Sequence, residues 1–179
     1  MSDERNLPDK PTSDSGNGAE APYFVISLTK FVVMSICTFG IYELYWFYRN
    51  WCLIKERERP DIRPFWRAFF AFFFCYECFE HIRSRAAYLK LPMSFSAGWM
   101  AAAWIIITLT WKLPDPYWLL TLFAFIPMLP VQALANRVNT REAPAHSQNN
   151  RFTGWNIVMV VLGGLSVILA VIGTFLSVK

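Results

Sequence analysis

Thiol, carboxylate and imidazole side chains are gathered between residues 75 and 81, inside an otherwise apolar stretch. Cys75 and Cys78 form a C-x-x-C pair, which elsewhere serves redox chemistry or supplies half of a zinc site. Glu77, Glu80 and His81 lie beside the pair and could add ligands. On one helix, however, the pair offers two thiols on one face, and the sequence has no second C-x-x-C to complete a tetrahedron. We therefore expect buried, inert cysteines, with no metal and no cofactor.

A second set of candidates consists of ionisable residues in or beside apolar segments. A charge near the bilayer centre costs about 2.5–3.5 kcal/mol on insertion scales, so such residues are candidates for a functional site. The set is a polar seam of Lys30, Glu43, Arg67, Glu77, Glu80 and His81. It could line a transport path or an active site. The alternative, which we favour, is that Arg67 or Lys30 neutralises Glu43 or Glu77 and that His81 lies at the lipid headgroups.

Catalytic motifs are missing from the sequence. It contains no Gly-rich phosphate loop, no H-E-x-x-H, no G-x-S-x-G and no suitably placed pair of carboxylates. A membrane-embedded hydrolase or transferase would need a nucleophile that faces a base, and serine and aspartate are scarce in the apolar segments. We therefore predict no catalytic residue, and we predict that the protein is not an enzyme.

Five long apolar segments must position these side chains. Each is about as long as the roughly 20 helical residues that cross a bilayer. They cover residues 23–40, 64–82, 93–111, 117–135 and 152–178. Because a helix satisfies its own backbone polar groups in lipid, the sequence predicts an all-α, polytopic integral membrane helical bundle of four to five segments. This bundle would be a single domain over residues 23–179, preceded by a polar, acidic and disordered tail over residues 1–22.

Glycine and proline predict where these helices break. Gly40 ends the first segment, so we expect a helix end or a sharp turn there. Pro127 and Pro130 predict a kink or break in the fourth segment. All three residues are candidate hinges. The second segment, with nine aromatic residues between positions 65 and 79, could span the membrane, re-enter it or lie along the interface.

The lysines and arginines between the segments favour particular arrangements, because cytosolic loops carry an excess of them. If all five segments cross, the two sides carry nearly equal numbers. If segment 64–82 does not cross, one side holds 11 lysines and arginines. If the first segment also folds back at Gly40, one side holds 13 of these residues and the other side 2. We favour these two arrangements. The net charge of +4 then reflects topology and lipid contact rather than nucleic-acid binding. Candidate lipid-headgroup contacts in the first loop are Arg49, Lys55, Arg57, Arg59 and Arg63.

Several motifs lie in a fixed order along the chain: KFVVMS at 30–35, TFGIY at 38–42, YWFYRNW at 45–51 and PFWRA at 64–68. With them the chain resembles a family of small bacterial inner-membrane proteins, classed as a domain of unknown function, that carries the motif TFGIYxxYWxY. RFTGWN at 151–156 is similar to that family's last helix. The resemblance covers most of the chain after residue 23. It implies a multi-pass protein of the bacterial cytoplasmic (inner) membrane, and it implies no activity and no catalytic residue.

Three functions remain open from the sequence. The leading hypothesis is a non-enzymatic scaffold, accessory or lipid-interacting protein, with the phospholipid bilayer and a membrane protein or a second copy as partners. The alternative is a small oligomeric transporter or channel whose path is lined by the part of the polar seam between residues 67 and 81. The third is a membrane-embedded enzyme that modifies lipids.

Overall fold

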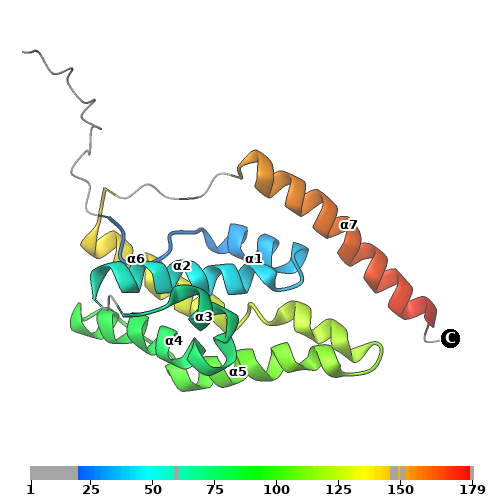
Figure 1. Ribbon diagram of the computed structural model, residues 1–179, viewed down its shortest axis with the longest axis horizontal. Coiled ribbons are helices and arrows are strands. Elements are labelled where there is room, and N and C mark those ends of the chain that lie inside the picture. The colour runs from blue at the N-terminus through cyan, green and yellow to red at the C-terminus, as the bar shows by residue number, and fades with distance from the viewer. Residues whose placement is uncertain (1–19, 59–60, 146–148, 150–151, 178–179) are drawn as a thin grey trace, which may run out of the picture.

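The computed structural model describes residues 20–58, 61–145, 149 and 152–177. Within these residues every regular element is a helix, which confirms the all-α prediction (Figure 1). The predicted tail, residues 1–22, lies almost entirely outside the described residues. The α-helices are α1 Leu28–Cys37, α2 Ile41–Arg57, α3 Pro64–Phe69, α4 Ala71–Tyr88, α5 Ala97–Leu109, α6 Met128–Glu142 and α7 Gly154–Ser177, and the 3-10 helices are η1 Thr110–Lys112 and η2 Tyr117–Phe123.

Aromatic side chains from α2, α4 and α5 form the centre of the core. Trp46, Phe47, Phe79 and Trp104 are all fully buried. The ring centroid of Phe47 lies 5.7 Å from that of Phe79 and 5.1 Å from that of Trp104. Aromatic side chains bury about 150–250 Å² each, so these contacts contribute a large share of the packing free energy. Helix α2 supplies two of the four rings and is the central helix of the fold.

The first apolar segment is not one bilayer-length helix. Residues 23–27 are extended, and α1 has 10 residues, a length of about 15 Å against the ~30 Å of a hydrocarbon core. The chain then turns at Gly40, whose φ of +83° suits a residue without a side chain. Contacts of Phe31 with Tyr42 and of Phe24 with Tyr45 show that α1 and α2 run antiparallel. The break at Gly40 is therefore confirmed, and the segment folds back on itself.

The aromatic second segment is also a reversal rather than a continuous helix. Phe70 separates α3 from α4 with φ −95° and ψ 40°. Arg67 and Glu77 form an ion pair at 2.8 Å, whereas residues ten apart on one straight helix would lie about 15 Å apart along its axis. Residues 64–82 therefore form two helices joined by a turn at Phe70, and the choice between a spanning, a re-entrant and an interfacial segment stays a prediction. Contacts of Arg67 with rings of α2 and α4 stabilise the reversal, and no glycine or proline marks it.

The third and fourth apolar segments form the hairpin that the five-residue connection 112–116 predicts. The hydroxyl of Thr121 donates to the carbonyl of Thr108 at 3.3 Å, which joins η2 to α5. The fourth segment is broken between η2 and α6, and Pro127 directly precedes α6. The predicted break is therefore present. The first part of the fourth segment is the 3-10 helix η2. Its second part is α6, which continues to Glu142, seven residues beyond the expected end at 135.

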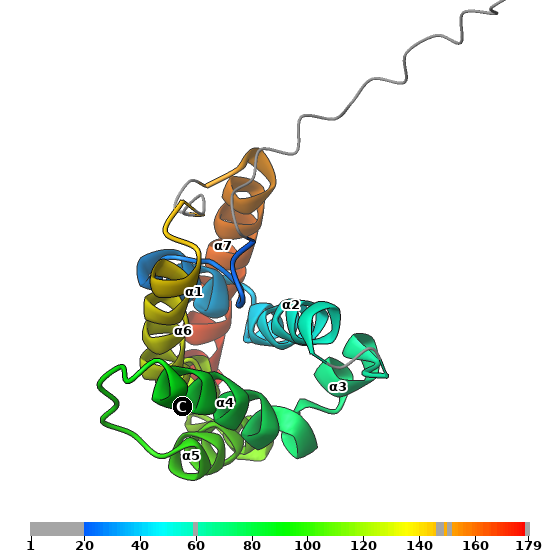
Figure 2. The same cartoon turned by 90° about the vertical axis from the view of Figure 1, so that its left-hand side faces the viewer.

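The three reversals bring the carboxyl ends of α2, α4 and α6 to one end of the bundle, at the left of Figure 1 and facing the viewer in Figure 2. Glu142 of α6 binds Arg57 of α2 and Arg85 of α4 there. We call this the charged end. The turn between α1 and α2 and the connection between η1 and η2 lie toward the opposite end. Among the described residues of those turns the basic residue is Lys112.

Helix α7 packs against α1 along part of its length and is apolar on most of its surface (Figure 1). Its 24 residues extend about 36 Å, which is enough to cross a bilayer core. Most of its large apolar side chains are exposed, including Trp155 at 79% and Leu176 at 68%. An apolar helix that neighbouring protein does not cover is typical of a membrane segment.

Among the described residues, two helical stretches are long and apolar enough to cross a membrane: Tyr117–Glu142 and Gly154–Leu176. The first three predicted segments do not belong to this group: α1 and α5 are too short, and segment 64–82 is divided between α3 and α4. The expected number of four to five membrane segments therefore stays a prediction.

Gly163 sets how closely α7 approaches α1. A Cβ atom at this position would overlap the carbonyl oxygen of Cys37 and lie 2.8 Å from its carbonyl carbon, whereas a Cβ at Gly173 would meet nothing within 4 Å. We expect Gly163→Ala to destabilise the protein by about 1–3 kcal/mol, because the backbone of α1 or α7 must shift. The matched control Gly173→Ala should be neutral or stabilising by up to about 1 kcal/mol, because alanine favours helix. Thermal unfolding in detergent measures both; equal midpoints would contradict the close contact.

Candidate functional site

The structure distributes the polar seam over four separate places. Apart from the pair of Arg67 with Glu77, each residue has its own neighbours, and the described residues do not bring the six side chains into one cavity or path. Lys30 lies on α1, Glu43 on α2, Arg67 on α3, and Glu77, Glu80 and His81 on α4. The pairing of Arg67 with Glu77 agrees with the structural interpretation of the sequence.

Glu43 lies in the core, 3% exposed, at the start of α2 and beside the Gly40 turn. The indole N–H of Trp104 donates to its Oε2 at 2.6 Å. Of the two carboxylates that Lys30 or Arg67 was expected to neutralise, Glu77 pairs with Arg67, whereas Glu43 receives a hydrogen bond from a neutral donor on α5. Burial raises the pKa of Glu43 from 4.5 to about 7, and the hydrogen bond from Trp104 opposes part of that rise. The group therefore changes protonation near neutral pH.

Arg67 joins three helices. Its guanidinium lies 4.5 Å from the ring centroid of Trp51 on α2 and 5.0 Å from that of Phe74 on α4, and it pairs with Glu77. Cation–π contacts of this kind contribute about 0.5–2 kcal/mol, and more when they are shielded from water. The side chain of Arg67 remains 21% exposed, so it is reachable from the surface.

His81 and Glu80 take part in separate contacts near the charged end. The Nε2 atom of His81 lies 2.8 Å from Oε2 of Glu58, and its Nδ1 atom lies 3.1 Å from the hydroxyl oxygen of Tyr23. Glu80 pairs with Arg83 on the next turn at 3.0 Å. These contacts connect α4 to α2 and to the extended segment before α1.

The candidate headgroup contacts near the charged end have different surroundings. Lys55 and Arg63 are exposed, and Arg49 is half-buried. Arg57 pairs with Glu142 at 3.4 Å, so part of its charge is already neutralised. Arg59 lies outside the described residues. Exposed Arg137 and Arg141 on α6, which we did not predict as contacts, extend the basic surface.

Lys30 is buried, with 2% of its surface exposed. Its Nζ atom donates to Oδ1 of Asn149 at 2.8 Å and lies 5.8 Å from the ring centroid of Phe152. Both neighbours precede α7, so this lysine connects α1 to the start of the last helix. Burial lowers its pKa.

Cys75 and Cys78 are both buried, as predicted. The thiol of Cys75 contacts the carbonyl of Phe72 at 3.7 Å. Burial raises the pKa of both thiols, to about 11 for Cys75, so they stay protonated at neutral pH. Within the described ranges no group of three or more His, Cys, Asp or Glu side chains could hold a metal ion.

Four carboxamides that we did not predict as important bind the extended backbone of residues 23–26. Asn139 receives the N–H of Tyr23 at 2.9 Å and donates to its carbonyl at 3.0 Å, and Asn50 receives the N–H of Phe24 at 3.1 Å. On α6, Gln132 donates to the Phe24 carbonyl and Asn136 to the Ile26 carbonyl. We call Asn50, Gln132, Asn136 and Asn139 the amide clasp. A signal was present in the sequence: the three members on α6 recur at steps of four and three residues, which places them on one helix face.

Comparisons with protein-family models, with curated proteins and with solved structures gave no match to this chain.

Asn139 gives a test of the amide clasp. We expect Asn139→Ala to destabilise the protein by about 2–4 kcal/mol, because it leaves a buried N–H and a buried carbonyl of Tyr23 without partners. Thr140→Ala, one residue further on the exposed face of α6, should change stability by less than about 0.5 kcal/mol. Chemical or thermal unfolding in detergent compares the two. Similar losses in both variants would contradict a specific role for the amide.

Glu43 gives a pH-dependent prediction. Its pKa of about 7 lies above the ordinary 4.5, so its contribution to stability is complete below about pH 4.5 and is lost as the pH rises through 7. Glu43→Gln keeps an acceptor for Trp104 and cannot ionise. Between about pH 5 and pH 8 the free energy of unfolding of the wild type should fall by on the order of 3 kcal/mol relative to that of this variant.

Unfolding midpoints at several pH values measure the effect of Glu43→Gln. Glu56→Gln, on an exposed face of the same helix, is the control and should follow the wild type. Parallel pH profiles for wild type and Glu43→Gln would show that Glu43 does not titrate in this range.

Proposed function

We propose that this chain is a multi-pass protein of the bacterial cytoplasmic membrane that acts without catalysis. In this proposal it is a scaffold or accessory protein whose charged end contacts anionic phospholipid headgroups on the cytosolic side. The resemblance of its motifs to an inner-membrane family supports the location. The bilayer is its first partner, and a membrane protein or a second copy is the next.

The observation that carries this proposal is the separation of charge from exposed apolar surface. The described lysines and arginines between the helices lie mostly around the charged end, whereas α7 and the α3–α4 reversal expose large apolar side chains. Phe65, Phe69 and Phe73 are 62%, 62% and 80% exposed. Exposed apolar surface costs about 25 cal/mol per Å² in water, and lipid removes that cost. Basic residues near an anionic membrane surface each contribute about 1 kcal/mol.

The transporter alternative has less support. Its path would need Arg67, Glu77 and His81 to line one passage, but the first two form a pair and His81 contacts Glu58 and Tyr23 instead. The side chain of Glu77 is 38% exposed, which places it at a surface rather than inside the bundle. No observation favours the third hypothesis, a lipid-modifying enzyme.

The proposed arrangement predicts which positions share a side of the membrane. Single cysteines at Lys55, Arg83 and Asp115, in a variant without the four native cysteines, would be labelled with an impermeant thiol reagent in intact and in opened cells. Positions 55 and 83 should be labelled from the cytosolic side and position 115 from the other side. If position 83 is labelled from outside, residues 64–82 cross the membrane and the proposed arrangement is wrong.

The charged end also predicts a preference for anionic lipid. Lys55→Gln with Arg141→Gln removes two exposed charges that form no ion pair among the contacts described above. We expect at least about a five-fold weaker affinity for phosphatidylglycerol, and a smaller wild-type affinity at high salt. Native mass spectrometry of the detergent-purified chain measures bound lipid. Lys112→Gln, at the opposite end, is the control; an equal effect there would contradict the proposal.

A further inference from the structure

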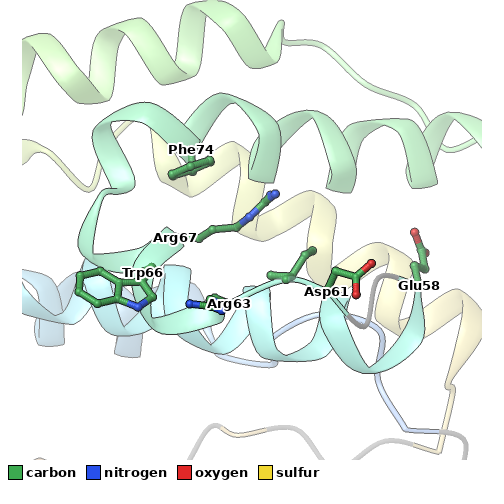
Figure 3. A pocket seen from close by; sticks show the side chains of 7 residues that line it. Glu58, Asp61, Arg63, Trp66, Arg67 and Phe74 are labelled. Carbon is green, nitrogen blue, oxygen red and sulfur yellow. The ribbon is translucent and has the colours of Figure 1, made fainter.

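A cavity of about 490 Å³ lies where α2 leads into α3, beneath α4 (Figure 3). This volume is within the range of sites that bind small ligands. The cavity is open to the surface. It is lined by Glu58, Asp61, Ile62, Arg63, Trp66, Arg67 and Phe74.

Among the described residues that line this cavity, two carboxylates and two guanidiniums lie on different sides. Figure 3 shows the carboxylates of Glu58 and Asp61 toward the end of α2, and the guanidiniums of Arg63 and Arg67 toward α3. A ligand that fits must therefore carry a negative group and a positive group a short distance apart. A purely anionic ligand would satisfy the arginines and be repelled by both carboxylates.

The cationic side of the cavity is positioned before any ligand arrives. The guanidinium of Arg67 is fixed between the rings of Trp51 and Phe74 and by its pair with Glu77. A planar guanidinium donates from several N–H groups and binds a phosphate with two of them. On the opposite side, one oxygen of Glu58 contacts His81, which fixes the direction of that carboxylate.

The cavity adjoins an exposed aromatic surface. Trp66, which lines it, is 50% exposed, and Phe65, Phe69 and Phe70 on the same reversal are exposed as well. Trp66 stacks on Phe70, with 6.0 Å between ring centroids. Aromatic side chains of this kind lie at the level where lipid headgroups meet acyl chains. A charged cavity beside such a surface suits an amphiphile rather than a soluble zwitterion.

We propose that this cavity binds one phospholipid whose headgroup carries a phosphate and a primary ammonium group. The phosphate binds Arg63 and Arg67, the ammonium binds Glu58 and Asp61, and the acyl chains lie along the aromatic surface of α3. This inference rests on the membrane location in the proposed function, and it does not rest on the preference of the charged end for anionic lipid.

The test uses the full chain in detergent and native mass spectrometry with phosphatidylethanolamine, phosphatidylglycerol and soluble phosphoethanolamine. Wild type should retain one phosphatidylethanolamine per chain. Asp61→Asn should weaken that lipid about five-fold while phosphatidylglycerol at the same site becomes tighter, because a repulsive charge is lost. Arg63→Gln should weaken both lipids. The controls Asp115→Asn and Lys112→Gln remove the same charges at the opposite end.

The outcomes separate this site from the charged end. Equal affinities of wild type and Asp61→Asn for phosphatidylethanolamine would overturn the site. The phosphatidylglycerol result for Lys55→Gln with Arg141→Gln tests the charged end independently of this outcome. Soluble phosphoethanolamine bound as tightly as the lipid would overturn the role of the aromatic surface. If Asp61→Asn fails to fold, Asp61→Ser is measured in its place, and an unchanged lipid ratio in that variant overturns the proposal equally.

Discussion

The fold depends on burying an extended piece of backbone inside a helical bundle. Residues 23–26 have no helical hydrogen bonds of their own, yet Tyr23, Phe24 and Ile26 are buried. Each unpaired buried N–H or carbonyl group would cost about 1–3 kcal/mol, and more in lipid. The amide clasp removes that cost. Because Asn50 belongs to α2 and the other three amides to α6, satisfying this one segment also fixes α2 beside α6.

The clasp has a consequence for the whole arrangement. With α2 and α6 linked through this segment and running in the same direction, their carboxyl ends lie at one end of the bundle, and Glu142 can bind both Arg57 and Arg85. Basic residues near helix carboxyl ends also interact favourably with the helix dipoles. The separation of charge from apolar surface therefore follows from the same geometry that satisfies the backbone of residues 23–26.

Local signals in the sequence predicted part of this fold correctly. Gly40 marked a turn and Pro127 marked a break, because glycine and proline act on the backbone next to them. The reversal at Phe70 could not be predicted in this way. It depends on Arg67 meeting Trp51, a residue from another helix, and no local breaker accompanies it.

The candidate site shows the same division between local and tertiary causes. The residue types of the polar seam were identifiable from their apolar surroundings, but their partners were not. Glu43 meets the indole of Trp104, 61 positions away in sequence, rather than a cation. An indole N–H can donate to a carboxyl oxygen whether or not the group is ionised, so composition alone did not distinguish it from a cation. The α6 amides were visible as polar residues, but the backbone that they bind was expected to be helical.

Arg67 shows why stability and binding must be separated at the cavity. Its contacts with Trp51, Phe74 and Glu77 join α2, α3 and α4, so replacing it would open the reversal and the cavity together. Arg63 and Asp61 are exposed and lie on the same cavity without such contacts among those described. Substitutions at these two positions change the charge presented to a ligand and leave the α3–α4 reversal in place. Substitutions at Arg63 and Asp61 therefore test ligand binding in the cavity, whereas a substitution at Arg67 tests the fold that forms the cavity.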